Sequence, residues 1–166
     1  MIQKTLVLIK PDGVQRNLIG EIIKRFEDAS LKVVELKMLI VSRDLISKHY
    51  PEDEEYMITI GKKSEAAGDK VDNYLEMGRM VVNSMRDFMI SGPIVSMVLE
   101  GEEAVPLVRK VTGYTDPSSA DKGTIRGDLG EDSIQAANKE KRPVKNLIHA
   151  SGTPKEAASE IKLWFP

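Results

Sequence analysis

The stretch from Lys145 to Ile161, KNLIHASGTPKEAASEI, combines the end of a strand, a tight turn and the start of a helix. The run that ends at Ile148 is typical of a strand, and small residues follow it at 150–152. Thr153 can accept a hydrogen bond from the amide of Glu156, while a proline occupies the first helical position. His149 therefore lies at the end of a rigid element, where a ligand can approach.

The helix that begins at Thr153 carries Glu160. If this helix folds back over the strand, the carboxylate of Glu160 can lie beside His149 and fix the tautomer of its imidazole. The free ring nitrogen is then a nucleophile or a base. The residues alone leave a second interpretation open, in which His149 is a strand-end histidine that hydrogen-bonds a carbonyl.

Three further strands are predicted before this stretch. Residues 5–9 (TLVLI) and 94–99 (IVSMVL) are continuously apolar, as in buried strands, whereas 34–40 alternates apolar and polar residues. Amphipathic patterns predict helices over 19–29 and from 102 to Gly113. The order favours an α+β fold, a ferredoxin-like sandwich with helices on one face of a four-stranded, mostly antiparallel sheet. A parallel doubly wound sheet is also compatible with the order.

Two segments lack a clear pattern. Residues 52–78 predict a surface insertion with a helical piece over 73–77, and 112–145 predicts a long functional loop. Gly61-Lys62 resembles part of a phosphate-binding P-loop, but Tyr56 and Lys63 stand where that motif needs glycine and a hydroxyl residue. The P-loop interpretation therefore fails.

Composition limits the possible functions. A chain of 166 residues fits one domain that buries roughly 70% of its unfolded surface. Because cysteine is absent and no signal-like segment precedes the first strand, we expect a cytoplasmic protein. No apolar run is long enough to span a membrane. A net charge of −2 and 5% aromatic residues argue against a nucleic-acid surface.

Three cations are candidate phosphate ligands, each with a simpler alternative. Lys10 ends the first strand before a Pro-Asp-Gly turn and can be incidental to it. Arg109 lies near a helix C-terminus, where arginine can cap carbonyls. Arg126 is flanked by Gly123 and Gly127, which fits either a solvated turn or a backbone that approaches an anion.

Four stretches in order resemble the nucleoside diphosphate kinases: TLVLIKPDGVQRNLIGEIIKRFE, SGPIVSMVLEGEEAV, TDPSSADKGTIRGD and NLIHASGTPKEAASEIKLWF. They extend from Thr5 to Phe165 and cover most of the chain. The resemblance implies a ferredoxin-like core and a ping-pong transfer of the terminal phosphoryl group from a nucleoside triphosphate, ATP among them, to a nucleoside diphosphate. His149 matches the nucleophile, and Glu160 with Ser151 matches the pair that orients it.

The resemblance also implies the substrate contacts. Lys10 and Tyr50 match residues near the transferring phosphate, and Lys10 and Asn146 match ligands of the ribose hydroxyls. The donors to the remaining phosphates correspond to Arg109, Thr115 and Arg126. Mg²⁺ in this family bridges phosphate oxygens, which agrees with the lack of a metal-ligand motif. Contacts with ribose and phosphate alone imply broad nucleoside specificity.

The sequence departs from the family at the base-binding position. Counting back from Gly92-Pro93 places Val81 where relatives carry an aromatic residue that stacks on the base. We predict weaker base binding unless Tyr56 or Tyr74 substitutes. A Val81→Phe variant with unchanged nucleotide affinity would contradict this alignment.

The domain is expected to span 1–166, with insertions at about 52–78 and 130–142. Because the second insertion falls in a loop that relatives use for subunit contacts, the oligomer is open: a homohexamer is favoured, with a tetramer or dimer possible.

Two other functions are compatible with this fold. One is a nucleotide-sensing or scaffold relative without activity, although binding alone would not need the nucleophile. The other is a ferredoxin-like nucleic-acid binder, which the acidic charge and the scarcity of aromatic residues disfavour.

Overall fold

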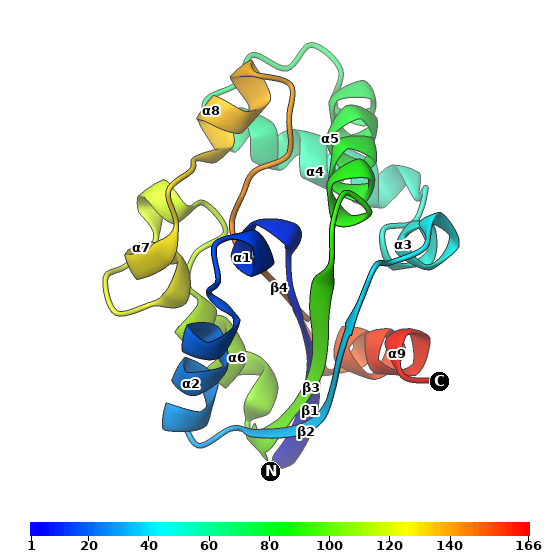
Figure 1. Cartoon of the computed structure of the whole chain (residues 1–166). Coiled ribbons are helices and arrows are strands. Elements are labelled where there is room, and N and C mark those ends of the chain that lie inside the picture. Colours follow the sequence, from blue (N-terminus) through cyan, green and yellow to red (C-terminus); the bar gives the residue numbers. More distant parts are fainter.

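The four strands form one antiparallel sheet in the order β2-β3-β1-β4 in the computed structural model, which describes residues 1–166 (Figure 1). The strands are β1 (Ile2–Ile9), β2 (Lys32–Leu39), β3 (Ile94–Glu102) and β4 (Ile148–Ala150). β1 pairs antiparallel with β3 and β4, and β2 pairs antiparallel with β3. The predicted ferredoxin-like α+β sandwich is confirmed, and a parallel sheet is excluded.

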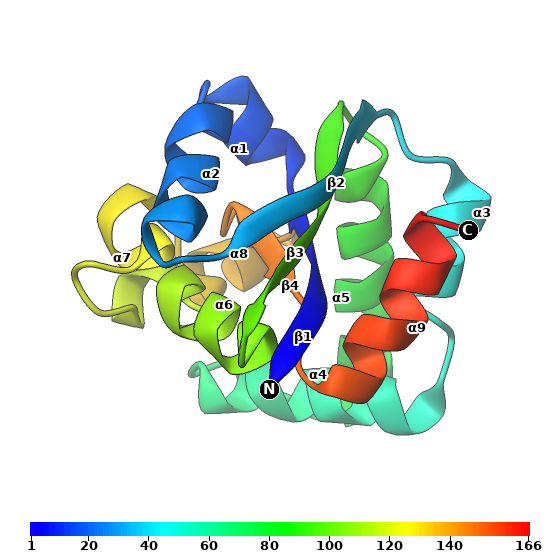
Figure 2. The ribbon, with the colours of Figure 1, turned by 90° about the horizontal axis from the view of Figure 1, so that it is seen from below.

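Helices cover both faces of this sheet, so the expectation of one covered face is wrong (Figure 2). Neighbouring residues of β1 point to opposite faces, and Val7 and Ile9 belong to one hydrophobic cluster while Leu6 and Leu8 belong to another. One face is covered by α2 (Ile19–Asp28) and α6 (Ala104–Thr112), and the other by α3 (Arg43–His49), α5 (Tyr74–Met89) and α9 (Pro154–Trp164). The second layer of helices brings α9 against β1 and β4.

The predicted helix start at Thr153 is confirmed, and a second side-chain cap, Ser42, starts α3. The hydroxyl of Ser42 accepts a hydrogen bond from the amide of Leu45 at 3.1 Å, and that of Thr153 accepts from the Glu156 amide at 3.1 Å. The carboxylate of Glu156 accepts from the Gly152 amide at 2.7 Å. These bonds satisfy amides that have no partner inside a helix. The two at Gly152 and Thr153 set the residue at which α9 begins, shortly after β4 in the chain.

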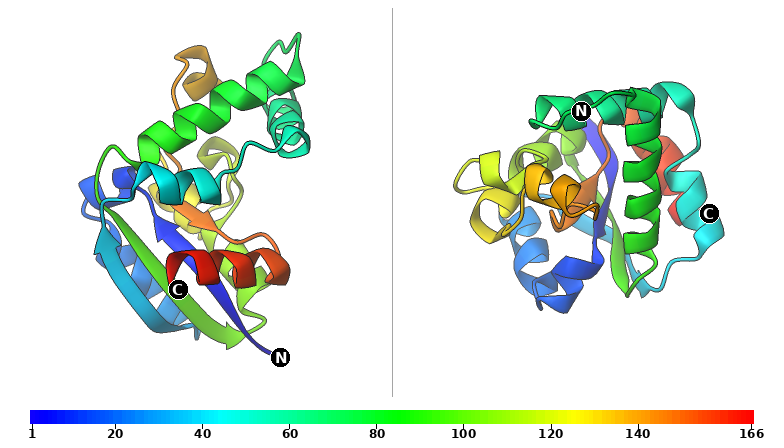
Figure 3. Two further views of the ribbon diagram at one scale, coloured as in Figure 1. Left: turned by 90° about the vertical axis from the view of Figure 1, so that its right-hand side faces the viewer. Right: turned by 90° about the horizontal axis from the view of Figure 1, so that it is seen from above.

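Residues 52–78 hold more helix than the sequence predicted. α4 (Glu54–Ala66) is capped by the carboxylate of Asp53, and α5 is capped by the side chain of Asn73. The two helices cross at close range (Figure 3), because Gly61 lies against the backbone of Tyr74, and Gly78 against that of Met57. α4 was missed because its contact face includes glycine and serine instead of a continuous apolar stripe.

A Gly78→Ala substitution should lower the free energy of unfolding by about 1–3 kcal/mol or more, because its Cβ would lie 1.8 Å from the carbonyl oxygen of Met57. Gly20→Ala in α2 is the matched control. Apart from its chain neighbours and the backbone of its own helix, no atom lies within 4 Å of the added Cβ, and a gain of about 0.4–1 kcal/mol is expected. Urea denaturation of both variants measures the difference. Equal stabilities would contradict the crossing of α4 and α5.

Two other segments also differ from expectation. Pro11, Asp12 and Gly13 begin a short helix, α1 (Pro11–Gln15), in place of the predicted turn. The long loop contains three helical turns, η1 (Pro117–Ser119), α7 (Ile125–Leu129) and α8 (Ile134–Lys139), each started by a side-chain cap. None of the helices is both long and apolar enough to cross a membrane.

Candidate active site

His149 lies at the centre of β4 instead of just after a strand, and its ring faces α9. Its Nε2 is 2.9 Å from Oε1 of Glu160, and the hydroxyl of Ser151 donates to Oε2 of the same carboxylate at 2.5 Å. α9 thus folds back over the sheet and brings Glu160 beside His149. Ser151 reaches the imidazole only through Glu160.

The backbone before His149 is constrained. Leu147 is buried and has a left-handed φ of 70°, which is uncommon for a residue with a side chain. Three hydrogen bonds hold it: its amide donates to Asp12 at 3.0 Å, its carbonyl accepts from the Lys10 amide at 2.8 Å, and the Ile148 amide donates to the Asn146 carbonyl at 2.8 Å. This tight turn sets the direction in which β4 presents His149.

Glu160 is ionised at neutral pH. Burial alone would raise the pKa of this carboxyl, but the hydrogen bond from His149, the nearby imidazole charge and the Ser151 hydroxyl lower it below its usual range. A carboxylate can only accept hydrogen bonds, so Nε2 of His149 carries the hydrogen. In the neutral imidazole, Nδ1 of His149 then keeps its lone pair.

An open cavity of about 860 Å³ lies over His149. His149, Glu160, Tyr50 and Arg109 line it. Three lysines that no sequence motif singled out also line it: Lys48, Lys63 and Lys155. The cavity is large enough for a nucleotide-sized ligand. Its four cations, the three lysines and Arg109, outnumber the three carboxylates of Asp53, Glu156 and Glu160 in the lining, which favours an anionic ligand.

The remaining predicted cations form a buried network beside the cavity. The ammonium group of Lys10 donates to the side-chain oxygen of Asn146 at 2.8 Å, and the Asn146 amide group donates to the carbonyl of Thr115 at 2.9 Å. The guanidinium of Arg126 donates to the carbonyls of Asn146 at 3.0 Å and Ile148 at 2.5 Å, and also to Gly113 at 3.2 Å. Two of its five N–H groups stay available.

Burial, and then the proximity of like charges, lowers the pKa values of two cations in this network. Burial, and then the charge of Arg126, lowers the pKa of Lys10 from 10.5 to about 8. Burial, and then the charge of Arg109, lowers the pKa of Arg126 to about 10. Both groups are still cationic at neutral pH. A bound anion would relieve their mutual repulsion.

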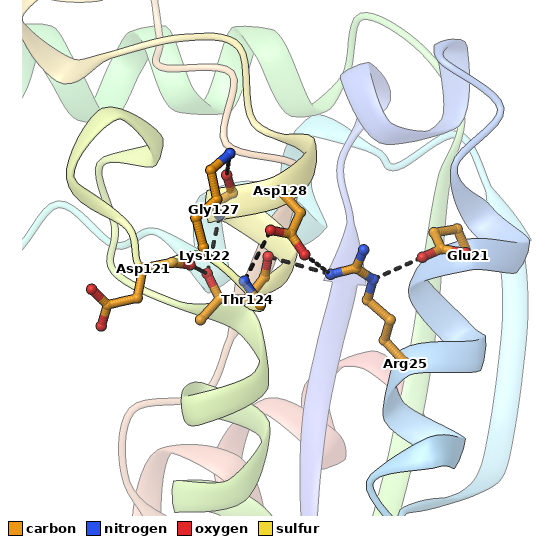
Figure 4. A network of polar contacts seen from close by, with 8 residues as sticks. Glu21, Arg25, Asp121, Lys122, Thr124, Gly127 and Asp128 are labelled. Carbon is orange, nitrogen blue, oxygen red and sulfur yellow. Dashed lines mark hydrogen bonds and ion pairs between the residues drawn. The ribbon is translucent and has the colours of Figure 1, made fainter.

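An ion-pair network positions α7, the helix that carries Arg126. Arg25 in α2 donates to Glu21 at 2.8 Å and to Asp128 at 2.7 Å, and Asp128 also accepts from the Gly123 amide at 2.9 Å (Figure 4). Thr124 caps α7 through the Gly127 amide at 3.0 Å. These contacts explain why the polar segment around Arg126 is an ordered helix instead of a solvated turn.

The base-binding candidates lie apart from one another. Val81 is half-buried on α5 and is not among the residues that line the cavity. Tyr56 of α4 does line it, whereas the hydroxyl of Tyr74 donates to Glu65 at 2.8 Å, outside the cavity. Thr115 is exposed, and its carbonyl is the group in contact with Asn146.

His49 is part of the site, although it was not among the candidates that the sequence predicted. Its ring centroid is 4.4 Å from that of His149. The only signal in the sequence was its place next to Tyr50, which carries no information about a partner 100 residues away.

Comparison with known proteins places the chain in a family. A family model described as nucleoside diphosphate kinase matches residues 3–58 and 52–166. The chain is 47% identical to a nucleoside diphosphate kinase of Pyrobaculum aerophilum, across 99% of this chain and 95% of that protein. A crystal structure of an NDP kinase from Pyrobaculum aerophilum matches with a TM-score of 0.94 and 44% identity, covering 100% and 97% of the two chains.

A second structure, the nucleoside diphosphate kinase of Borrelia burgdorferi with bound vanadate and ADP, matches with a TM-score of 0.84 and 38% identity over 99% of this chain and 88% of that one. An antiparallel α+β sandwich with a carboxylate-bound imidazole in a cation-lined cavity has the parts that a phosphotransferase needs. The chain belongs to the nucleoside diphosphate kinase family, and it is an enzyme that transfers phosphoryl groups between nucleotides.

Proposed function

We propose that Nδ1 of His149 carries the phosphoryl group between the two nucleotides. The lone pair of Nδ1 forms the N–P bond while the bond from phosphorus to the bridging oxygen breaks, and the leaving diphosphate keeps that electron pair. A terminal oxygen of the acceptor diphosphate then attacks the phosphorus and releases the imidazole. The 2.9 Å contact between His149 Nε2 and Glu160 carries this proposal, since it leaves Nδ1 as the free nucleophile.

Glu160 stabilises the charge that develops on the imidazole, because Nε2 keeps its hydrogen when Nδ1 bonds to phosphorus. Ser151 holds the carboxylate in place from its second oxygen. Since each nucleotide exchanges its phosphoryl group with the protein, the first product leaves before the second substrate binds, and ping-pong kinetics follow. A single-turnover assay with γ-labelled ATP, followed by a chase with an unlabelled nucleoside diphosphate, tests both half-reactions.

The cations are assigned to the phosphates. Arg109 in the cavity and Arg126 beside it are proposed to bind the non-transferring phosphates together with Thr115, while Lys10 and Tyr50 bind near the transferring group. Burial raises the pKa of the Tyr50 hydroxyl above its usual range, so this group is a neutral donor. Lys10 and Asn146, already hydrogen-bonded to each other, are proposed to turn to the ribose hydroxyls.

Mg²⁺, when bound with the nucleotide phosphates, would neutralise part of their charge. Three side chains, His49, His149 and Glu160, could share one ion, with ligand atoms within 4.8 Å of one another. Glu160 already accepts from His149 and Ser151, and His49 accepts from Trp164. These existing bonds support the proposal that phosphate oxygens of the nucleotide, instead of these three side chains, would hold the ion.

We also propose that residues 1–166 act as one kinase domain, with the segments at 52–78 and 130–142 as insertions. Tyr56 lines the cavity and Tyr74 does not. This difference supports Tyr56 as the aromatic residue that stacks on the base in place of Val81. Cytoplasmic residence, use of ATP, and a homohexameric, tetrameric or dimeric assembly stay predictions.

Lys10 should give the reaction an alkaline limit. Above a pH of about 8 the free enzyme loses this charge, so kcat/KM should fall with increasing pH, whereas kcat should hold to higher pH because bound phosphate favours the charged lysine. Initial rates from pH 6.5 to 10 measure both limits. A Lys10→Arg variant, which does not deprotonate in this range, should lack the limit near pH 8; a limit that persists would assign it to another group.

In the same pH range, the contribution of Lys10 to the free energy of unfolding should rise with pH, whereas kcat/KM falls. Below a pH of about 8 both folded and unfolded chains hold the proton on Lys10, and the cost of burying the charge is fully present. Between about 8 and 10.5 the folded chain releases the proton first, so this cost fades and stability from this group rises. Urea midpoints of the wild type and of Lys10→Met separate this contribution from those of other groups.

A further inference from the structure

His49 lies at the end of α3 with a fully buried side chain, enclosed by three rings of the active site. Its ring centroid is 4.4 Å from that of His149, 4.5 Å from that of Tyr50 and 5.5 Å from that of Trp164, each in an edge-to-face arrangement. His49 also contributes to the lining of the cavity. The proposed mechanism gives this imidazole no role.

The tautomer of His49 is determined by one contact. The indole nitrogen of Trp164 lies 3.2 Å from Nδ1 of His49, and an indole N–H can only donate. Nδ1 must therefore accept, so the hydrogen of the neutral ring is on Nε2. Burial, and then the charges of His149 and Lys10, lowers the pKa of His49 to about 3 against the opposing effect of Glu160, which keeps the ring neutral.

No protein group bonds to Nε2 of His49, which is buried without a hydrogen-bond partner. Nothing on that side of the ring favours the Nε2–H tautomer. The bond from Trp164 is consequently the one contact that favours the Nε2–H tautomer.

The alternative tautomer would interfere with the nucleophile. Nδ1 of His49 is 3.7 Å from Oε1 of Glu160, the same oxygen that His149 contacts at 2.9 Å. With a hydrogen on Nδ1, His49 would need to move by only about 0.5 Å to become a second donor to this oxygen. His149 would then lose part of the contact that holds its ring and directs its hydrogen to Nε2.

We propose that Trp164 and His49 form a positioning pair, in which the indole N–H keeps Nδ1 of His49 unprotonated and so reserves Oε1 of Glu160 for His149. This proposal rests on the proposed role of His149 as the phosphoryl carrier. Neither Trp164 nor His49 needs to touch the substrate. Their effect is on the orientation and tautomer of the imidazole that does.

The test uses the fact that the chain has one tryptophan and two histidines. Biosynthetic replacement of tryptophan by β-(benzothiophen-3-yl)alanine exchanges the indole N–H for sulfur at position 164 alone and nearly preserves its shape. Nitrogen-15 NMR of the two imidazoles then reports each tautomer directly. Trp164→Phe is the second variant, in case the analogue is poorly incorporated.

We expect His49 to shift toward the Nδ1–H tautomer, and the single-turnover rate of His149 phosphorylation to fall on the order of tenfold with KM nearly unchanged. Adding His49→Leu to either change should recover part of that rate, because the competing donor is gone. If the changes only damaged the structure, the double variant would be slower than the single one.

An Nε2–H tautomer that persists without the indole N–H, an unchanged phosphorylation rate, or a further loss in the double variant would each overturn the pair. These outcomes are distinct from failure of the phosphohistidine itself, which would appear as a wild-type protein that takes up no phosphoryl group.

Discussion

Replacing His149 by glutamine should reduce phosphoryl transfer to background and prevent labelling of the protein by γ-labelled ATP with Mg²⁺. Glutamine can keep a hydrogen bond to Glu160, so the site can retain its shape, but its amide nitrogen has no lone pair that can attack phosphorus. Because both half-reactions use Nδ1 of His149, no other group can compensate for its loss. The measurement is acid-labile, base-stable label on the protein, together with the rate of triphosphate formation.

The second histidine supplies the control. A His49→Leu variant keeps Nδ1 of His149 and should still become labelled, at a changed rate. Label that persists in His149→Gln would move the nucleophile to another residue. A wild-type chain that takes up no label would instead indicate a nucleotide-sensing or scaffold protein with the same fold.

The strands and the helix starts were predictable because their signals are local. The buried run from Thr5 to Ile9, the capping residues Ser42 and Thr153, and Gly113 at the end of α6 each determine structure within a few residues. The proximity of His149 and Glu160 could also be anticipated, since only a short turn separates β4 from α9.

The contacts that the sequence did not predict join distant parts of the chain. α4 packs through Gly61, whose role depends on a backbone approach by Tyr74 that no hydrophobic period announces. The bond between Trp164 and His49 spans 115 positions. The burial of Lys10 and Arg126 likewise depends on how β4 and the long loop close around them, so sequence could place two cations near the site but could not predict their lowered pKa values.

Arg126→Met should lower the rate by about 10²–10³-fold, as removal of a charged donor from a transition-state site does, and should also destabilise the fold. The guanidinium donates to three main-chain carbonyls, of Gly113, Asn146 and Ile148. The Asn146 carbonyl keeps the bond from the Ile148 amide, so two acceptors, the carbonyls of Gly113 and Ile148, lose their partner. Each such acceptor costs about 1–3 kcal/mol, so we expect the free energy of unfolding to fall by at least about 2 kcal/mol. Stopped-flow kinetics and urea denaturation measure the two effects separately.

Arg109→Met separates the two roles of a cation at this site. Arg109 lines the same cavity but is exposed, so its loss should reduce the rate while the free energy of unfolding stays within about 0.5 kcal/mol of wild type.

Arg126→Lys should return part of the rate, because the charge is restored, but less of the stability, because one ammonium cannot reproduce the planar fork of bonds to three carbonyls. Equal stability losses in the Arg109 and Arg126 variants would contradict this structural role. Arg126 donates to the carbonyls of Asn146 and Ile148, on both sides of the turn that presents His149. The same guanidinium therefore supports β4 and is available to bind phosphate.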